Sequence, residues 1–477
     1  SNNNWSGLGN PSPVNGRDFQ GLNGSVEVIV SSVTGGWYVG GNFRRAGGVA
    51  GADYLAHWDG NSWSAIGPGL NGPVHAITVN GSDLYVAGEF TEAGGMVAAG
   101  GVARWNGGSW SAIASGLNLS SSAVVKALAH DGSNLYAGGW FVNAGASSNL
   151  TGLAKWDGNS WSSVGLFVYG FVDSLAYDAG SLYAGVGNGL VEWDGSNWSN
   201  LGGGLNGRVH SISIGDDGIF AGGSFTDAGG FTNADGLAMW DGISWSSIGS
   251  WHNNQYPLIN KVVFAAGRLY VGGEEQMSAG SAMNSLLMWD GIDWSSLGSG
   301  LSSLHVSALA FGDNGLLAGG YISKAGGETS NNIAHWRAPR FVSPLTGGTL
   351  DGASHEIVWS ASGAAVTEWQ LELTDALAGN QLFFVTGLAG STLSTVVAGL
   401  PTDGREIEAA LRYRLQGGSV WYSADASFLA HSVVTTPVIT SPLAGSTLSG
   451  GSETIQWSEV DGALSYRILI GSSPGGS

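Results

Sequence analysis

A short tryptophan-rich hairpin recurs along this chain and constrains the fold more than any other feature. Within residues 153–162 an apolar run ends at Trp156, an Asp-Gly turn signal follows, and a second run opens with Trp161. Four residues separate the two tryptophans, so their rings can pair across two antiparallel strands and fix the register. The first tryptophan of each copy stands at Trp58, Trp105, Trp156, Trp193, Trp240, Trp289 and Trp336.

The spacing of these hairpins predicts the architecture. Successive first tryptophans lie 37 to 51 residues apart, a period typical of β-propeller blades. The second repeat contains four strand-like segments, over residues 74–79, 84–90, 101–105 and 110–113. The last repeat has three, whereas residues 4–9 match the fourth segment of the first repeat, residues 62–67. We therefore predict an all-β fold in which residues 1–338 form a seven-bladed β-propeller closed by an N-terminal strand, which leaves no exposed sheet edge.

A glycine doublet precedes most of the hairpins and carries a family resemblance. It stands at Gly40-Gly41, Gly138-Gly139, Gly222-Gly223, Gly272-Gly273 and Gly319-Gly320, where crowded inner strands need close backbone approach. With the preceding Leu-Tyr-Val and the later tryptophan, it resembles the kelch-like β-propeller repeats of bacterial secreted proteins. The resemblance implies the fold and a secreted or cell-surface location in bacteria. The tryptophan pair five residues apart departs from the kelch spacing, so kelch partner-binding roles are not carried over.

The composition changes after Pro339. Residues 341–430 contain seven strand-like runs, and the last of these resemble the closing strands of a bacterial fibronectin type III-like module. The segment Ser343-Pro344-Leu345 returns 98 residues later as Ser441-Pro442-Leu443. We predict a fibronectin type III-like (Ig-like) β-sandwich over residues 339–434 and the start of a second, incomplete module over residues 435–477. The second module would need further chain or a partner's strand, which allows self-assembly through these modules.

The charge balance restricts the partners. Asp and Glu number 36 against 16 Lys and Arg, a net charge of −20, and such a surface repels phosphate backbones, so we expect no nucleic-acid partner. The scattered acids favour solubility over attraction of Ca²⁺ or cationic ligands. No apolar run reaches the roughly 18 residues of a membrane span, so none is expected.

Aligning the first strands of the repeats places one polar residue of each near the axis of the predicted ring. The seven are Glu27, His75, Lys126, Asp173, His210, Asn260 and Ser307. They form either an axial site for a ligand or metal, with His75, His210, Glu27 and Asp173 as ligands, or a water-filled channel lined by solvated side chains. The mixture of lysine and acids suits mutual neutralisation better than a metal.

A second candidate site lies on the loops that vary most between repeats. Aromatic and amide side chains suited to sugar recognition gather there, since ring faces stack on sugars and amides bind hydroxyls. The candidates are Trp251, His252, Gln255, Tyr256, Phe167 and Tyr169. The alternative is that these rings only cap the blade edges.

The hairpin turns hold six Asp or Asn residues before glycine, at Asp59, Asn106, Asp157, Asp194, Asp241 and Asp290. They lack the alternating acids of a Ca²⁺ cage, and turn chemistry accounts for them; no cofactor is expected, and Ca²⁺ is the weaker alternative. No catalytic arrangement stands out. We predict a non-catalytic extracellular or cell-surface binding or adhesion protein that recognises glycan or protein. The alternatives are a structural subunit of an extracellular assembly or filament, and a carbohydrate-active hydrolase or lyase on a propeller scaffold.

Overall fold

The computed structural model describes most of the chain, in two compact units, Ser1–Ala338 and Pro339–Ser477. The described residues are 5–8, 21–97, 99–114, 116–117, 124–144, 147–148, 150–166, 170–230, 234, 236–248, 258–279, 282–297, 300–312, 315–326, 328–337, 340–344, 347–350, 352–360, 366–415, 421–431, 439–441 and 456–457. The finer division of the second unit into residues 339–434 and 435–477 stays a prediction.

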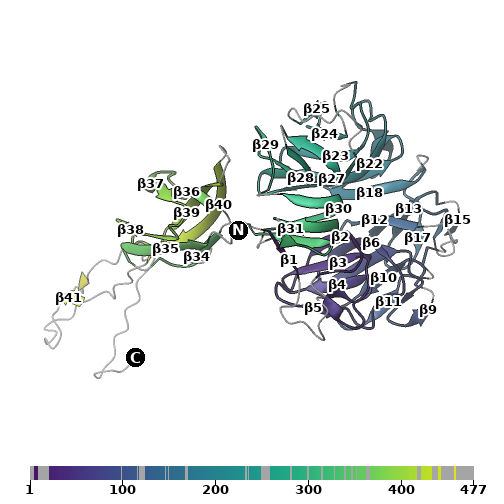
Figure 1. Ribbon diagram of the computed structural model, residues 1–477, viewed down its shortest axis with the longest axis horizontal. Helices are drawn as coiled ribbons and strands as arrows, with labels where there is room; N and C mark the ends of the chain where they lie inside the picture. The colour runs from purple at the N-terminus through teal and green to yellow at the C-terminus, as the bar shows by residue number, and fades with distance from the viewer. Residues whose placement is uncertain are drawn as a thin grey trace, which may run out of the picture. The chain divides into compact units, whose positions relative to one another are not determined.

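The fold is all-β and built from many small antiparallel sheets (Figure 1). Each of the first five repeats forms one four-stranded sheet with its strands in chain order. These sheets are β2 (Ser25–Ser31), β3 (Trp37–Asn42), β4 (Leu55–Trp58) and β5 (Trp63–Ala65); β6 (Val74–Asn80), β7 (Asp83–Gly88), β10 (Val102–Trp105) and β11 (Trp110–Ala112); β12 (Val124–His130), β13 (Leu135–Trp140), β16 (Leu153–Trp156) and β17 (Trp161–Ser162); β18 (Val172–Asp178), β19 (Ser181–Val186), β20 (Gly189–Trp193) and β21 (Trp198–Asn200); β22 (Arg208–Gly215), β23 (Gly218–Ser224), β24 (Leu237–Trp240) and β25 (Trp245–Ser247). Two ribbons, β8 (Glu92–Ala93) with β9 (Met96–Val97) and β14 (Asn143–Ala144) with β15 (Ser147–Ser148), and a 3₁₀ turn at Ala46–Gly48 complete these repeats as described.

The sixth and seventh repeats differ from the expected separate blades, because they share one nine-stranded sheet. Its strands are β26 (Ile259–Ala265), β27 (Arg268–Ala279), β28 (Ala282–Trp289), β29 (Trp294–Ser295), β30 (Leu301–Gly312), β31 (Gly315–Ala325), β32 (Glu328–Thr329), β33 (Ile333–Trp336) and β1 (Trp5–Gly7). Strands β27 and β30 are twelve residues long and extend until Glu274 pairs with His305. The pairing of β1 with β33, Trp5 opposite Trp336, confirms that the N-terminal segment supplies a strand to the last repeat.

The first strands of the repeats contact one another in the order β2, β6, β12, β18, β22, β26 and β30, and β30 in turn contacts β2. Strands β2 and β30, far apart in the sequence, therefore lie side by side (Figure 1). Val26 and Ile29 of the first repeat share a buried cluster with Ala308 and Leu317 of the last. A Cβ atom added to Gly319 would lie 2.4 Å from Val26 Cγ1. The last repeat thus packs on the first as tightly as consecutive repeats pack on each other.

The hairpin tryptophans form the outer packing of the first unit. In the six complete hairpins the ring centroids of the two tryptophans lie 5.1–5.6 Å apart. The second tryptophan also reaches the preceding repeat, where its indole N–H donates to the carbonyl three residues after that repeat's second tryptophan. These hydrogen bonds run from Trp110 to Ile66, Trp161 to Ile113, Trp198 to Val164, Trp245 to Leu201, Trp294 to Ile248 and Trp5 to Leu297. These bonds tie six of the seven repeats to the preceding one, whereas the indole N–H of Trp63 in the first repeat has no hydrogen-bond partner among the described residues.

The second unit holds two facing groups of strands. A three-stranded sheet contains β34 (Arg340–Ser343), β35 (Ser354–Ser360) and β38 (Ser394–Ala398), and a four-stranded sheet contains β37 (Gln381–Ala389), β36 (Val366–Asp375), β39 (Glu406–Leu415) and β40 (Trp421–Leu429). A further pair is β41 (Ile439–Ser441) with β42 (Gln456–Trp457). Trp359, Trp369 and Tyr413 are buried and in contact, and form the centre of this unit's core. In the described part of the chain, no helix is long and apolar enough to span a membrane.

Candidate functional site

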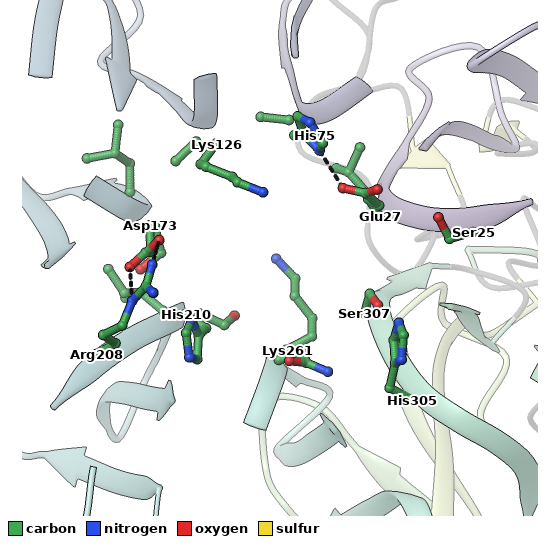
Figure 2. Close-up of a pocket in the computed structure, with 18 of the residues that line it drawn as sticks. Ser25, Glu27, His75, Lys126, Asp173, Arg208, His210, Lys261, His305 and Ser307 are labelled. Carbon is green, nitrogen blue, oxygen red and sulfur yellow. Dashed lines mark hydrogen bonds and ion pairs between the residues drawn. The ribbon is translucent and has the colours of Figure 1, made fainter. Parts of the chain in front are cut away.

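A cavity of about 730 Å³ opens where the first strands of the repeats meet, and we call it the ring cavity. All seven polar residues that the alignment selected line it, namely Glu27, His75, Lys126, Asp173, His210, Asn260 and Ser307. Figure 2 shows side chains from strands far apart in the sequence surrounding this open space. The structure therefore brings one polar position from every repeat to a single site.

A β-bulge in each first strand explains why these seven positions face the cavity. In every repeat the pairing between the first and second strands skips one residue, and the skipped residue is the lining residue. In the first repeat, for example, Val26 pairs with Gly41 and Val28 with Gly40, which leaves Glu27 unpaired. A bulge bends the strand and redirects the extra side chain. Seven bulges at one level thus create a ring of variable residues on a constant backbone.

A glycine doublet opposite five of the seven bulges allows this close packing. A Cβ atom at Gly41 would lie 2.2 Å from the carbonyl oxygen of Ser25 on the neighbouring strand, and one at Gly40 would lie 2.6 Å from Val74 of the next repeat. Neither space accepts a methyl group. The predicted role of the doublet, close approach of the inner strands, is confirmed by these distances.

The acidic residues on the two sides of the cavity are each held by a basic partner. Glu27 contacts His75 Nδ1, and His75 Nε2 lies 3.0 Å from Glu89 Oε1. Burial raises the pKa of Glu27, but the hydrogen bond and charge of His75 outweigh burial, so the pKa falls below its usual range. Opposite, Arg208 donates two hydrogen bonds to Asp173, at 2.9 Å from Nε and 2.6 Å from Nη2. Figure 2 draws both pairs as dashed lines.

The other ring residues make weaker or neutral contacts. His210 Nε2 lies 3.3 Å from Ser224 Oγ, and burial lowers the pKa of His210. Asn260 donates to the carbonyl oxygen of Val306 at 3.3 Å. Lys126 directs its amine toward the middle of the cavity (Figure 2). The ring therefore combines two carboxylates fixed by basic side chains with groups that remain accessible from the cavity.

Several lining residues were missed by the sequence alignment. Arg208 and His305 stand two positions before the bulge residues of their strands, and Lys261 follows the bulge residue Asn260. Residues two apart on a strand share a face. The two-residue spacing from the bulge positions could therefore have predicted Arg208 and His305. Trp140 lines the cavity from the end of β13, and its role depends on packing that no local pattern encodes.

The second candidate site was predicted on the variable loops. Its residues Trp251, His252, Gln255, Tyr256, Phe167 and Tyr169 lie outside the described residues. Their proposed role in sugar recognition stays a prediction.

The Asp and Asn residues of the hairpin turns use their oxygens within the turn. Asp59 Oδ1 accepts backbone N–H groups of Asn61 at 2.8 Å and Ser62 at 2.7 Å, and the other five turns repeat this pattern. These bonds lower the pKa of Asp59. Within the part of the chain that is described, no group of three or more His, Asp or Glu side chains is arranged to hold a metal ion.

The sequence matches no protein-family model and no curated protein. Solved structures with some likeness include the extracellular domain of a one-component system from B. thetaiotaomicron, 12% identical with a TM-score of 0.41 over 86% of this chain and 56% of that one. PorZ, a bacterial surface component of the type-IX secretion system of Porphyromonas gingivalis, is 13% identical with a TM-score of 0.32 over 82% of this chain and 64% of that one. Sqt1 of Saccharomyces cerevisiae is 12% identical with a TM-score of 0.39 over 90% of this chain and 99% of that one. The chain thus spans less than two thirds of the length of the B. thetaiotaomicron domain and of PorZ. These likenesses are too distant to carry an argument about function, which has to follow from the site itself.

Proposed function

We propose that this chain is a non-catalytic binding protein of the cell exterior and that the ring cavity holds its ligand, a glycan. The observation that carries the proposal is the set of seven bulges, which present six different residue types to one cavity on an otherwise repeated backbone. A repeat that served only as a scaffold would need no such variation. A concave site with a few convergent polar groups is typical of ligand binding.

The architecture that we infer for the first unit is a closed seven-bladed β-propeller. The cyclic contacts of the first strands, the pairing of β1 with β33 and the indole bond from Trp5 to Leu297 support it. The seven strands of the second unit, in sheets of three and four, support a fibronectin type III-like sandwich. A crystal structure of the chain tests both, and an open gap between β2 and β30 would contradict the closed ring.

The charged groups of the cavity support binding rather than hydrolysis. A glycosidase needs one carboxylic acid with a raised pKa to protonate the leaving group. The pKa of Glu27 is lowered instead, and Asp173 is held by two hydrogen bonds from Arg208. The Glu27 carboxylate is therefore held in the ionised form, which cannot donate a proton, and the Asp173 carboxylate is occupied by the Arg208 guanidinium.

A glycan array with the intact chain tests the proposal. Trp140 lines the cavity with 38% of its surface exposed, so Trp140→Ala should weaken glycan binding while the melting temperature stays within a few degrees. The matched control is Ile243→Ala, which removes an exposed apolar side chain from an outer turn. Absence of binding to any glycan by the intact chain, or release of products from polysaccharides, would contradict the proposal.

A further inference from the structure

The cavity contains two lysine amines that form no direct ion pair with its carboxylates. Lys126 stands on β12 and Lys261 on β26, and Figure 2 shows both amines directed into the open space between the strands. Among the described residues, neither amine has an ion-pair partner within 4.0 Å. Burial lowers the pKa of Lys261, which means that its charge is poorly solvated without a counter-ion.

Two of the three carboxylates that line the cavity are engaged by other side chains. Glu27 contacts His75, and Asp173 accepts two hydrogen bonds from Arg208. The third lining carboxylate, Glu274, is exposed on β27. A lysine held in a cavity without a partner costs stability, so retaining two of them is more readily explained by a ligand than by the fold.

An aromatic surface lies beside these cations. Trp140 and Phe171 are 38% and 50% exposed, and their ring centroids lie 5.8 Å apart. The Arg208 guanidinium carbon lies 5.5 Å from the Trp140 ring centroid, so the ion pair with Asp173 and the stacked tryptophan hold each other in place. Exposed ring faces next to fixed polar groups are suited to the apolar face of a sugar.

We propose that the ring cavity binds a saccharide that carries an anionic group, a carboxylate or a sulfate, with Lys126 and Lys261 binding the anion and Trp140 contacting the sugar ring. This inference rests on the proposed function and names its ligand class. The chain as a whole carries a net charge of −20, which repels anions at long range. Binding of an anionic sugar therefore has to come from these local amines, because the protein surface offers no general attraction.

The experiment uses a glycan array that contains uronate-bearing, sulfated and neutral oligosaccharides, followed by calorimetric titration of the strongest hit. The hits should be anionic, and the comparison of uronates with sulfated sugars identifies which anion binds. Lys126→Gln and Lys261→Gln should each raise the Kd about tenfold or more, as expected for loss of a charge-assisted hydrogen bond. Lys155→Gln on β16 makes the same change of charge on the outer hairpin and should leave the Kd unchanged.

The melting temperature gives an independent readout. Because neither amine has an ion-pair partner among the described residues, the replacement of either lysine should leave the melting temperature unchanged or raise it. The two lysines stand on different strands, so either variant alone tests the inference if the other fails to fold. Neutral hits only, or anionic hits that bind both lysine variants as tightly as the parent, would overturn it while the glycan-binding function survives. Absence of any hit would overturn the proposed function as well.

Discussion

The outer hairpins and the inner bulges of the first unit follow opposite rules. The outer hairpins repeat the same side chains in the same packing, with tilted tryptophan pairs and, in every complete hairpin but the first, an indole bond to the preceding repeat. The inner bulges repeat the same backbone while the side chain varies, from Glu27 and His75 to Lys126. Identical residues therefore pack between the repeats, whereas variable residues on an identical backbone line the cavity.

The physical reason lies in what surrounds each position. The ring of Trp245 is 2% exposed and fills a fixed space between two sheets, so another side chain would leave a void or a clash. A bulge residue such as Lys126 makes no strand pair, and its side chain is directed into the cavity (Figure 2). The identity of such a residue can therefore change at little cost to the fold.

The largest loss of stability is expected from removing the N-terminal strand β1, which pairs with the last strand of the first unit, β33. Deleting residues 1–10 removes β1, so the last repeat loses the strand paired with Trp336 and the bond from Trp5 to Leu297. Loss of one buried tryptophan costs about 3–5 kcal/mol, and the exposed sheet edge adds a risk of aggregation. Chemical unfolding measures the loss, and deletion of residues 1–4 is the control that keeps Trp5. A deletion of ten residues that unfolds like the parent would show that closure contributes nothing.

The next largest loss of stability is expected from replacing a hairpin tryptophan, and it should differ between the two tryptophans of one hairpin. Trp245 is buried and donates to Leu201 across the repeat boundary, whereas Trp240 is half-buried. Trp245→Ala should cost about 3–5 kcal/mol of unfolding free energy, and Trp240→Ala clearly less. Urea unfolding of the two variants checks this order. An equal or reversed cost would mean that the stacked pair, and not the bond between repeats, holds the outer layer.

A glycine substitution tests whether the first and last repeats are packed as tightly as consecutive ones. In Gly319→Ala the new methyl group would lie 2.4 Å from Val26 Cγ1, so overpacking should cost about 1–3 kcal/mol. Val26→Ala in the same chain should recover part of the loss, which a double-mutant cycle measures. Gly187→Ala is the control, because nothing lies within 4 Å of its added methyl. Equal stability of Gly319→Ala and Gly187→Ala would contradict the closed arrangement.

The sequence predicted the constant features of this unit better than its variable ones. The hairpin tryptophans and the pairing of Trp5 with Trp336 followed from local pattern and period. The seven lining positions followed from alignment of the repeats, because a bulge recurs at one place in each. The joining of β27 to β30 was not predictable, since strand length there depends on contact between repeats. Nor was the pairing of Asp173 with Arg208 instead of with Lys126, because it depends on distances between side chains from different repeats.

The smallest change in stability is expected in the hairpin turn itself, where aspartate is replaced by asparagine in one repeat. Asp157 Oδ1 accepts the backbone N–H groups of Asn159 and Ser160, and Asn106 makes the same two bonds in its own turn. The bond from Ser160, with that from Asn159, lowers the pKa of Asp157 below 3.8. The ionised carboxylate therefore stabilises the fold above this pH, and the contribution is lost as the pH falls through the folded-state pKa.

Asp157→Asn keeps an acceptor oxygen in the turn, as Asn106 provides at the equivalent position, but its side chain does not titrate. Its melting temperature should match the parent near pH 7 and fall less than the parent's between about pH 5 and pH 3. Asp157→Ala removes the acceptor and should melt lower than both near pH 7, because two turn N–H groups lose their partner. Calorimetric melts of the three proteins across this pH range measure the difference. If Asp157→Asn lost as much stability in acid as the parent, the carboxylate would be inert in the turn, and geometry alone would explain why aspartate recurs there.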